Sequence, residues 1–179
     1  MRASNDKLLV PELRKQSEAI THAELVKVAE KWLYKTMGCG VVFTELVTMC
    51  PEIPDALGLR SDYTILVECK TSRSDFLADK RKDFRRTPEK GIGDYRFYLC
   101  REGLIGPDEL PSKWGLLYWN GKQVKKVRAP SGNVGSTWRE FKFDKNHIRE
   151  FRIMYSALRR IHLRGYLGLI YERAVVAQV

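Results

Sequence analysis

The stretch "ILVECKTSRSDFLADKRK", residues 65–82, decides the fold. It begins as an apolar run typical of a buried strand and ends as a charged helix. Ser72 can cap that helix, because a serine oxygen accepts a hydrogen bond from a free backbone N–H, and Asp75 suits its first turn. Side chains alternate along a strand, so Glu68 and Lys70 point to the same face. A strand followed directly by a helix predicts an α/β fold.

The flanking sequence predicts a mixed α/β layout. A first helix begins at a capping box formed by Thr21 and Glu24, and it ends at Gly38. Asn120-Gly121 is typical of a tight β-hairpin turn. Strands are expected at 41–47, 55–60, 63–70 and 95–100, a hairpin at 114–128, a second helix at 73–86 and a basic helix from about 146. We therefore expect a mixed central sheet flanked by helices, with a C-terminal basic helix.

Length and charge limit the classes of function. The chain of 179 residues fits one domain, with a core over about 17–130 and a helical appendage over about 144–175. Its net charge of +10 favours a polyanionic partner, above all nucleic acid. The four cysteines form no Cys-x-x-Cys pair, which argues against a zinc ribbon and for reduced thiols. Without a signal peptide or an apolar run long enough for a bilayer, we expect a cytoplasmic protein with no membrane partner.

Two acidic residues are expected to meet in the hairpin formed by strands 55–60 and 63–70. If the chain turns at Ser61-Asp62, the antiparallel register brings Asp55 opposite Glu68. Directly opposed Cβ atoms lie about 4.5–5.5 Å apart, so the two carboxylates repel unless a cation lies between them. Mg²⁺ prefers oxygen ligands, and the backbone carbonyl of Cys69 could supply a further one. Lys70 would stand beside this metal and could stabilise a phosphate.

The remaining acids and histidines have structural as well as functional interpretations. Glu45 is a further candidate catalytic acid on strand 41–47, with Glu24 and Glu30 of the first helix as alternatives. Asp75 is expected to be a structural acid of its helix, and Asp79 is expected to be solvated. The three histidines show no metal-ligand spacing and are expected at the surface or as caps: His22, His147 and His162. For Glu68 and Lys70 the alternative is an exposed ion pair on an edge strand.

These motifs resemble a known group of nucleases. "IPD" at 53–55 and "ECK" at 68–70 are similar to the PD-(D/E)XK nuclease superfamily. Four further segments resemble the MmcB-like DNA repair branch of this superfamily, over about residues 20–120: "TEL", "ECKTSRSDFLADKRKDFR", "YRFYLC" and "LPSKWGLL". Two features depart from that branch: Ile53-Pro54 replaces basic residues before the aspartate, and a tryptophan of the helix is absent.

The resemblance implies a restriction-endonuclease-like fold and Mg²⁺-dependent hydrolysis of DNA phosphodiester bonds, with Mn²⁺ as a substitute. It implies Asp55 and Glu68 as metal ligands, Lys70 as the catalytic lysine and Glu45 as an auxiliary acid. DNA repair, recombination or phage DNA processing is the expected context. Two alternatives remain: a catalytically silent DNA-binding or scaffold module, and an RNA-binding protein without catalysis. The oligomeric state is left open, and a homodimer is one possibility.

Two basic runs are expected to contact the DNA backbone without sequence preference. They contain the predicted DNA-binding residues Lys80, Arg81, Lys82, Arg85, Arg86, Arg149, Arg152, Arg159 and Arg160. In the second run, apolar residues recur at helical spacing and are expected to form the buried side of the helix: Ile148, Phe151, Tyr155 and Leu158.

Overall fold

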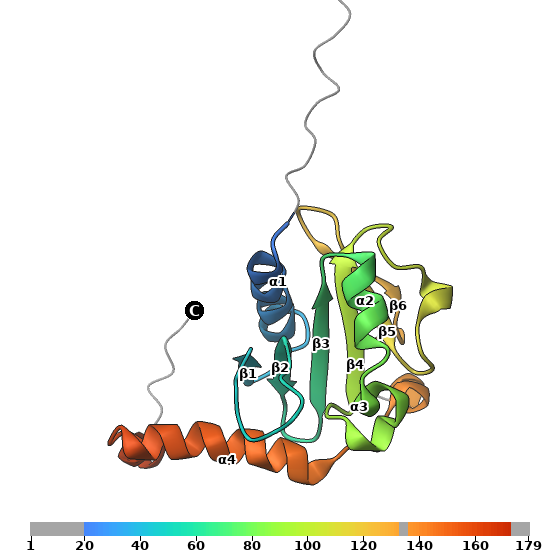
Figure 1. Cartoon of the computed structure of the whole chain (residues 1–179). Coiled ribbons are helices and arrows are strands. Elements are labelled where there is room, and N and C mark those ends of the chain that lie inside the picture. The colour runs from blue at the N-terminus through green and yellow to red at the C-terminus, as the bar shows by residue number, and fades with distance from the viewer. Residues whose placement is uncertain (1–19, 133–135, 173–179) are drawn as a thin grey trace, which may run out of the picture.

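The computed structural model describes residues 20–132 and 136–172 and shows one mixed six-stranded sheet flanked by helices (Figure 1). The strands are β1 (Val41–Thr44), β2 (Ala56–Leu59), β3 (Thr64–Lys70), β4 (Tyr95–Arg101), β5 (Gly115–Trp119) and β6 (Val124–Arg128). The helices are α1 (His22–Lys35), α2 (Arg73–Asp79), α3 (Asp83–Arg86) and α4 (His147–Leu163), with short 3-10 helices η1 (Pro88–Lys90), η2 (Pro107–Glu109), η3 (Ser136–Phe141) and η4 (Leu167–Tyr171). The predicted mixed α/β core and C-terminal helix are confirmed.

The strands lie in chain order across the sheet, and β3 lies inside it between β2 and β4. It pairs antiparallel with β2, with Ala56 opposite Val67 and Leu59 opposite Thr64, which is the register predicted from the turn. On its other side β3 is parallel to β4, so the chain must cross over between them, and α2 and α3 provide that crossover. Every residue of β3 is buried.

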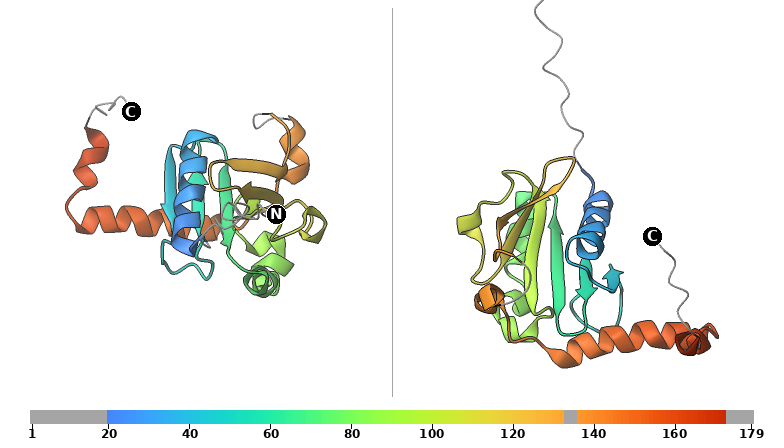
Figure 2. Two further views of the ribbon diagram at one scale, coloured as in Figure 1. Left: turned by 90° about the horizontal axis from the view of Figure 1, so that it is seen from above. Right: turned by 180° about the vertical axis from the view of Figure 1, so that it is seen from behind.

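Helices cover both faces of the sheet (Figures 1 and 2). The helix α1 opens with the predicted capping box and buries a stripe that includes Leu25 and Leu33. One core cluster joins this stripe to the face of β3 that carries Val67. A second cluster joins Phe76 of α2 to the face that carries Leu66. Since Glu68 shares the parity of Leu66, its side chain lies on the α2 side. The four cysteines are free and buried.

Two predicted elements end or divide differently in the structure. The strand predicted at 41–47 ends at Thr44, because Glu45 adopts a left-handed φ of 48° that no strand residue has. The helix predicted at 73–86 is two helices, α2 and α3, separated at 80–82. The bend turns Asp79 and Arg85 inward, where their side chains form an ion pair at 2.9 Å.

The helix α4 begins where predicted but is not buried as predicted. The Asn146 side chain caps it by accepting a hydrogen bond from the Arg149 N–H at 3.0 Å. Its buried residues are Glu150 and Ile153. The four residues expected to be buried are instead 49–66% exposed: Ile148, Phe151, Tyr155 and Leu158. Helical spacing predicted the stripe correctly, but it could not show that the domain contacts another side of the helix. No helix in 20–132 or 136–172 combines the length and apolar character needed to span a bilayer.

Gly115 in β5 provides a test of how tightly the sheet is packed. A Cβ atom at this position would lie 2.2 Å from the Phe97 ring and 3.0 Å from the Arg128 carbonyl oxygen. We expect Gly115→Ala to lower the free energy of unfolding by about 1–3 kcal/mol, since overpacking forces side chains and backbone to shift. Gly40→Ala is the control, because its Cβ meets nothing within 4 Å. Urea unfolding measures both variants, and equal stabilities would contradict the packing seen here.

Candidate active site

The predicted acid pair lies where β3 ends. Glu68 and Lys70 are almost fully buried, at 2% and 3% exposure. Asp55 comes one residue before β2, and the β2–β3 register, extended by one residue, brings it opposite Glu68. The alternative of an exposed ion pair on an edge strand is therefore wrong, since β3 lies between β2 and β4.

Asp55 is held in an environment that resists its negative charge. Its Oδ2 accepts a hydrogen bond from the Cys69 N–H at 2.7 Å. Burial, followed by the nearby charge of Glu68, raises the pKa of Asp55 to about 6, although Lys70, the Cys69 N–H and His22 act in the opposite direction. A cation bound by Asp55 would offset this strain on the ionised form.

The backbone of Cys69 faces the Asp55 side of β3. The Cys69 N–H donates to the Asp55 carboxylate at 2.7 Å. In a strand the N–H and C=O of one residue point to the same side, so the Cys69 carbonyl oxygen is expected on that side too. The Pro54 carbonyl oxygen accepts from the Glu45 N–H at 3.1 Å, which ties the "IPD" segment to the end of β1.

Lys70 is held as a cation by a group of acids. Its Nζ lies 3.3 Å from Glu68 Oε2, 3.6 Å from Asp79 Oδ1 and 3.9 Å from Asp75 Oδ1. Burial lowers the pKa of Lys70, but the nearby carboxylates, Glu68 above all, raise it more, so its pKa lies above the usual value. Lys70 is therefore charged at neutral pH and suited to stabilising negative charge rather than to accepting a proton.

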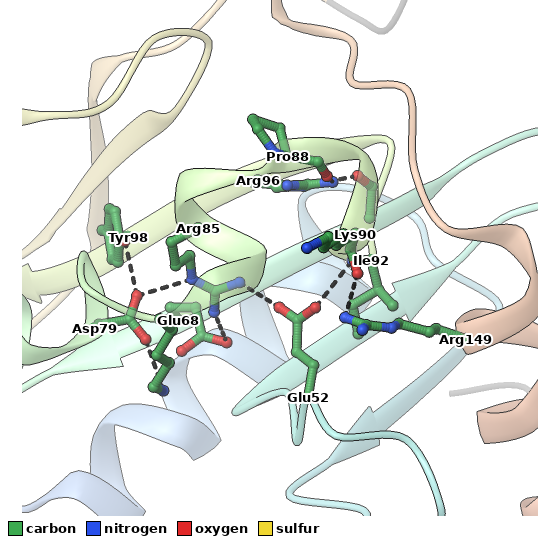
Figure 3. Close-up of polar contacts among 12 residues, drawn as sticks. Glu52, Glu68, Asp79, Arg85, Pro88, Lys90, Ile92, Arg96, Tyr98 and Arg149 are labelled. Atoms are coloured by element: carbon green, nitrogen blue, oxygen red, sulfur yellow. Dashed lines mark hydrogen bonds and ion pairs between the residues drawn. The ribbon is translucent and has the colours of Figure 1, made fainter.

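Arg85 lies at the centre of a buried ion network (Figure 3). Its guanidinium contacts Glu52, lies 2.8 Å from Glu68 Oε1 and donates to Asp79 at 2.9 Å. Only 1% of its side chain is exposed. The prediction that Arg85 binds DNA is therefore wrong, because three carboxylates hold its guanidinium inside the domain.

Sequence reasoning missed two acids of this network. Asp79 was expected in solvent, but it is 1% exposed and accepts a hydrogen bond from the Tyr98 hydroxyl at 2.8 Å. Glu52 is equally buried and accepts from the Ile92 N–H at 3.0 Å. Glu52 lies between two prolines in "CPEIPD", where the sequence has no periodicity that could predict burial. Its burial depends on the path of this loop in the folded domain.

His22 was also underestimated. Its Nε2 lies 3.3 Å from Asp55 Oδ1 and 3.5 Å from Glu45 Oε1, so the first residue of α1 bridges two candidate acids. Glu45, 54% exposed, thus reaches the rim of the site, as the prediction of an auxiliary acid requires. Its rival Glu24 is occupied by the capping box with Thr21. His147 and His162 are exposed, as expected.

The donor atoms near Lys70 are oxygen atoms, the kind of ligand that Mg²⁺ prefers. Among residues 20–132 and 136–172 there is no cluster of three or more His, Cys, Asp or Glu side chains arranged for a metal. Mg²⁺ is commonly bound through one or two carboxylates, with water and substrate phosphate completing its shell. Asp55, Glu68 and the Cys69 carbonyl would provide such a set. Glu68 would have to share its carboxylate with Arg85 and Lys70.

The exposed cations fall into two separate groups. Lys80 donates to the Glu109 carbonyl at 2.9 Å and Lys82 pairs with Asp79 at 2.8 Å, whereas Arg81 and Arg86 are exposed. These four follow Lys70 closely in the chain. Their contact with DNA stays a prediction.

The cations of α4 lie at the other end of the sheet. Thr64, the first residue of β3, donates to Glu150 of α4 at 2.7 Å, whereas Lys70 is the last residue of β3. A strand of this length spans about 20 Å, and α4 runs across the end opposite the site (Figure 1). Arg149 and Arg160 donate to the backbone carbonyls of Lys90 and Val47. The arginines of α4 therefore do not flank Lys70.

Comparisons with known proteins bear on the fold alone. The sequence matches no model of a protein family, and a search of curated proteins gives no match either. The structure is similar to the solved structure of the SPO1766 protein of unknown function from Silicibacter pomeroyi, with a TM-score of 0.52 and 21% identity. The similarity covers 88% of this chain and 98% of the other. The two proteins share a fold.

The raised pKa of Asp55 gives a stability test with a definite sign. An acid whose pKa is higher in the folded state destabilises the fold once it ionises, so the penalty is absent below about pH 4 and complete above about pH 6. We expect Asp55→Asn to raise the free energy of unfolding by about 1–3 kcal/mol at neutral pH. Denaturant unfolding in EDTA across this pH range measures it.

Glu45→Gln provides the control for this test. Glu45 is more than half exposed, so its replacement should change stability by less than about 0.5 kcal/mol. A gain for Asp55→Asn that does not shrink as the pH falls would show that the ionised carboxylate is not the cause.

Proposed function

We propose that this chain is a Mg²⁺-dependent nuclease that hydrolyses DNA phosphodiester bonds. The proposal depends on one observation: Asp55, 17% exposed and one residue before β2, comes opposite buried Glu68 of β3 by the strand register, and charged Lys70 lies on the same face as Glu68. The resemblance to PD-(D/E)XK nucleases, which relies on these residues, supports it. DNA repair, recombination or phage DNA processing is the corresponding context.

The roles follow from the chemistry of each group. Asp55, Glu68 and the Cys69 carbonyl would hold Mg²⁺, which when bound activates water and neutralises charge on the phosphate. Lys70, kept charged by its neighbouring carboxylates, would stabilise the negative charge that develops on the phosphate during attack. Glu45 and His22, at the exposed rim, would contact water or substrate at the mouth of the site.

DNA contact is assigned to the cations that follow Lys70 in the chain. Lys80, Arg81, Lys82 and Arg86 lie in the segment formed by α2, α3 and their connection, which begins directly after β3. Such contacts bind the phosphate backbone regardless of sequence, so binding should weaken steeply as salt rises. The net charge of +10 is consistent with this mode of binding.

A catalytically silent DNA-binding module is the second candidate. The observation that favours it is the state of Glu68, whose two carboxylate oxygens already face Arg85 and Lys70. An acid neutralised by two cations has less charge to offer a metal. The two candidates share the DNA-binding surface and differ only in whether the acids act on a metal.

Cleavage assays distinguish the two candidates. Supercoiled plasmid, linear duplex, single strands and branched DNA are incubated with the full chain in Mg²⁺, Mn²⁺ or EDTA. The nuclease proposal predicts cleavage of at least one substrate with either metal and none in EDTA. Cleavage that survives EDTA contradicts the mechanism. Binding of DNA without cleavage under all conditions supports the silent module.

A further inference from the structure

We propose that α4 and η4 form a docking surface for an acidic amphipathic helix of a partner protein. This surface lies at the other end of the sheet from Lys70 and does not depend on the proposed nuclease activity. The proposal combines three properties of α4: an exposed apolar seam, arginines beside that seam, and the absence of an exposed carboxylate.

The apolar seam consists of Ile148, Phe151, Tyr155 and Leu158. These side chains are 66%, 62%, 54% and 49% exposed. The buried residues of α4 are Glu150 and Ile153, and every residue of the helix from Leu158 onward is exposed, although Arg160 donates to the Val47 carbonyl. Helices of globular proteins owe most of their stability to burial of an apolar face, so a seam of this size indicates a missing partner.

The spacing of the seam is that of helix-to-helix packing. Its members alternate at three and four residues, which aligns them in one stripe along α4. From Ile148 to Leu158 the stripe runs about 15 Å. The rings of Phe151 and Tyr155 lie nearly parallel with centroids 6.3 Å apart. Beyond the end of α4, η4 exposes two further apolar side chains, Leu169 and Ile170, each 57% exposed.

The charge beside the seam selects an acidic occupant. Arg152 and Arg159 each follow a seam residue directly, and both are exposed. Glu150 is the one acid of α4, and it is turned into the domain, where it accepts from the Gly93 N–H at 2.7 Å and pairs with Lys145 at 2.7 Å. The exposed surface of α4 therefore offers cations beside an apolar stripe and no carboxylate. An occupant that places leucines in the seam and glutamates beside it would complement both.

A second copy of this chain fits less well. If two α4 helices packed antiparallel through their seams, the flanking positions Arg152 and Arg159 would face arginines of the other helix, and like charges oppose that pairing. The chain's net charge of +10 adds to the repulsion. DNA is also a poor match for the seam, because the aliphatic side chains of Ile148 and Leu158 gain nothing from phosphates.

The test uses synthetic helical peptides and the full chain. Each peptide has about four heptads, with leucine at the seam positions and either glutamate or lysine beside them. Fluorescence anisotropy should show the glutamate peptide binding at least about 10-fold more tightly than the lysine peptide. The double variant Arg152→Glu/Arg159→Glu should reverse that preference. Tyr155→Glu, in the middle of the exposed seam, should weaken binding of the glutamate peptide by at least about 10-fold.

Two controls separate docking from simple charge attraction. A glutamate peptide with alanine at the seam positions should bind at least about 10-fold more weakly than the leucine version. Arg139→Glu, which changes an exposed arginine of η3, should leave peptide binding unchanged. Equal binding of the glutamate and lysine peptides overturns the proposal.

Binding of a different partner to the seam would give different experimental results. A dimer in light scattering that Tyr155→Glu disperses would assign the seam to a second copy. Binding to anionic vesicles or to a single-stranded oligonucleotide that is lost in Tyr155→Glu, with no binding of the glutamate peptide, would assign it to a membrane or to nucleic acid. Each of these results overturns the acidic-helix proposal, and none of them affects the cleavage assay.

Discussion

Replacing Lys70 with methionine is expected to lower the rate of DNA cleavage about 10²–10³-fold, since it removes a preorganised cation from the point where charge develops. Methionine keeps an unbranched side chain, one atom shorter than that of lysine, and removes the ammonium with its charge and its N–H donors. The Lys70 ammonium lies 3.3 Å from Glu68, on the site face of β3. Single-turnover cleavage of plasmid at saturating protein measures the chemical step rather than DNA binding.

Controls for Lys70→Met must separate chemistry from folding. The variant leaves Glu68 and Asp79 with one cation fewer, so its thermal unfolding is measured first and the assay is run well below the transition. Lys31→Met, on the exposed face of α1, should cleave at the normal rate. Glu68→Gln should also abolish cleavage through the loss of a metal ligand. A folded Lys70→Met protein that cleaves at the normal rate would exclude Lys70 from the mechanism.

Replacing Arg85 with methionine is expected to destabilise the fold by about 3–5 kcal/mol. The substitution leaves Glu52, Glu68 and Asp79 buried without the guanidinium that they share. Burial raises the pKa of Asp79, but Arg85 and then Lys70 lower it further, so its pKa lies below the usual value and Asp79 stays ionised in the native protein. A loss of this size is a large part of the stability of an ordinary domain.

Urea unfolding of Arg85→Met beside Arg81→Met measures this effect. Arg81 is exposed, so its replacement should change stability by less than about 0.5 kcal/mol. Adding Glu52→Gln to Arg85→Met should recover part of the loss, because it removes one of the uncompensated charges. Equal stability of the two arginine variants would mean that the ion network does not support the fold. Arg85→Lys, which keeps the charge, tests the network even if Arg85→Met does not fold.

Local sequence patterns were sufficient to predict much of the fold. The capping box at Thr21 and the cap at Ser72 were correctly placed, because a cap depends on residues within one helical turn. The register of β2 and β3 followed from a turn at Ser61-Asp62, since a short turn determines the pairing of its strands. Asp55 was thereby brought opposite Glu68 without any knowledge of the rest of the domain.

Errors in the site came from residues whose role depends on distant contacts. Arg85 and Asp79 belong to a charged helix in sequence, and local pattern places such residues in solvent. They are buried because the chain bends between α2 and α3 and brings them against Glu68 and Glu52 from other segments. His22 meets Asp55 for a similar reason, since the start of α1 lies beside the ends of β1 and β2.

The residues of β3 and its turn were enough to establish an α/β sheet with an acid pair and a lysine on one face, because strand alternation and hairpin register are local rules. Periodicity also revealed an apolar stripe on α4. Which side of α4 meets the domain is decided by the hydrogen bonds that Glu150 accepts from Thr64 and Gly93, and the burial of Arg85 is decided by its ion pair with Glu52. In each case the partners lie far apart in the chain. Such pairings depend on how packed layers bring separate segments together, which no local spacing encodes.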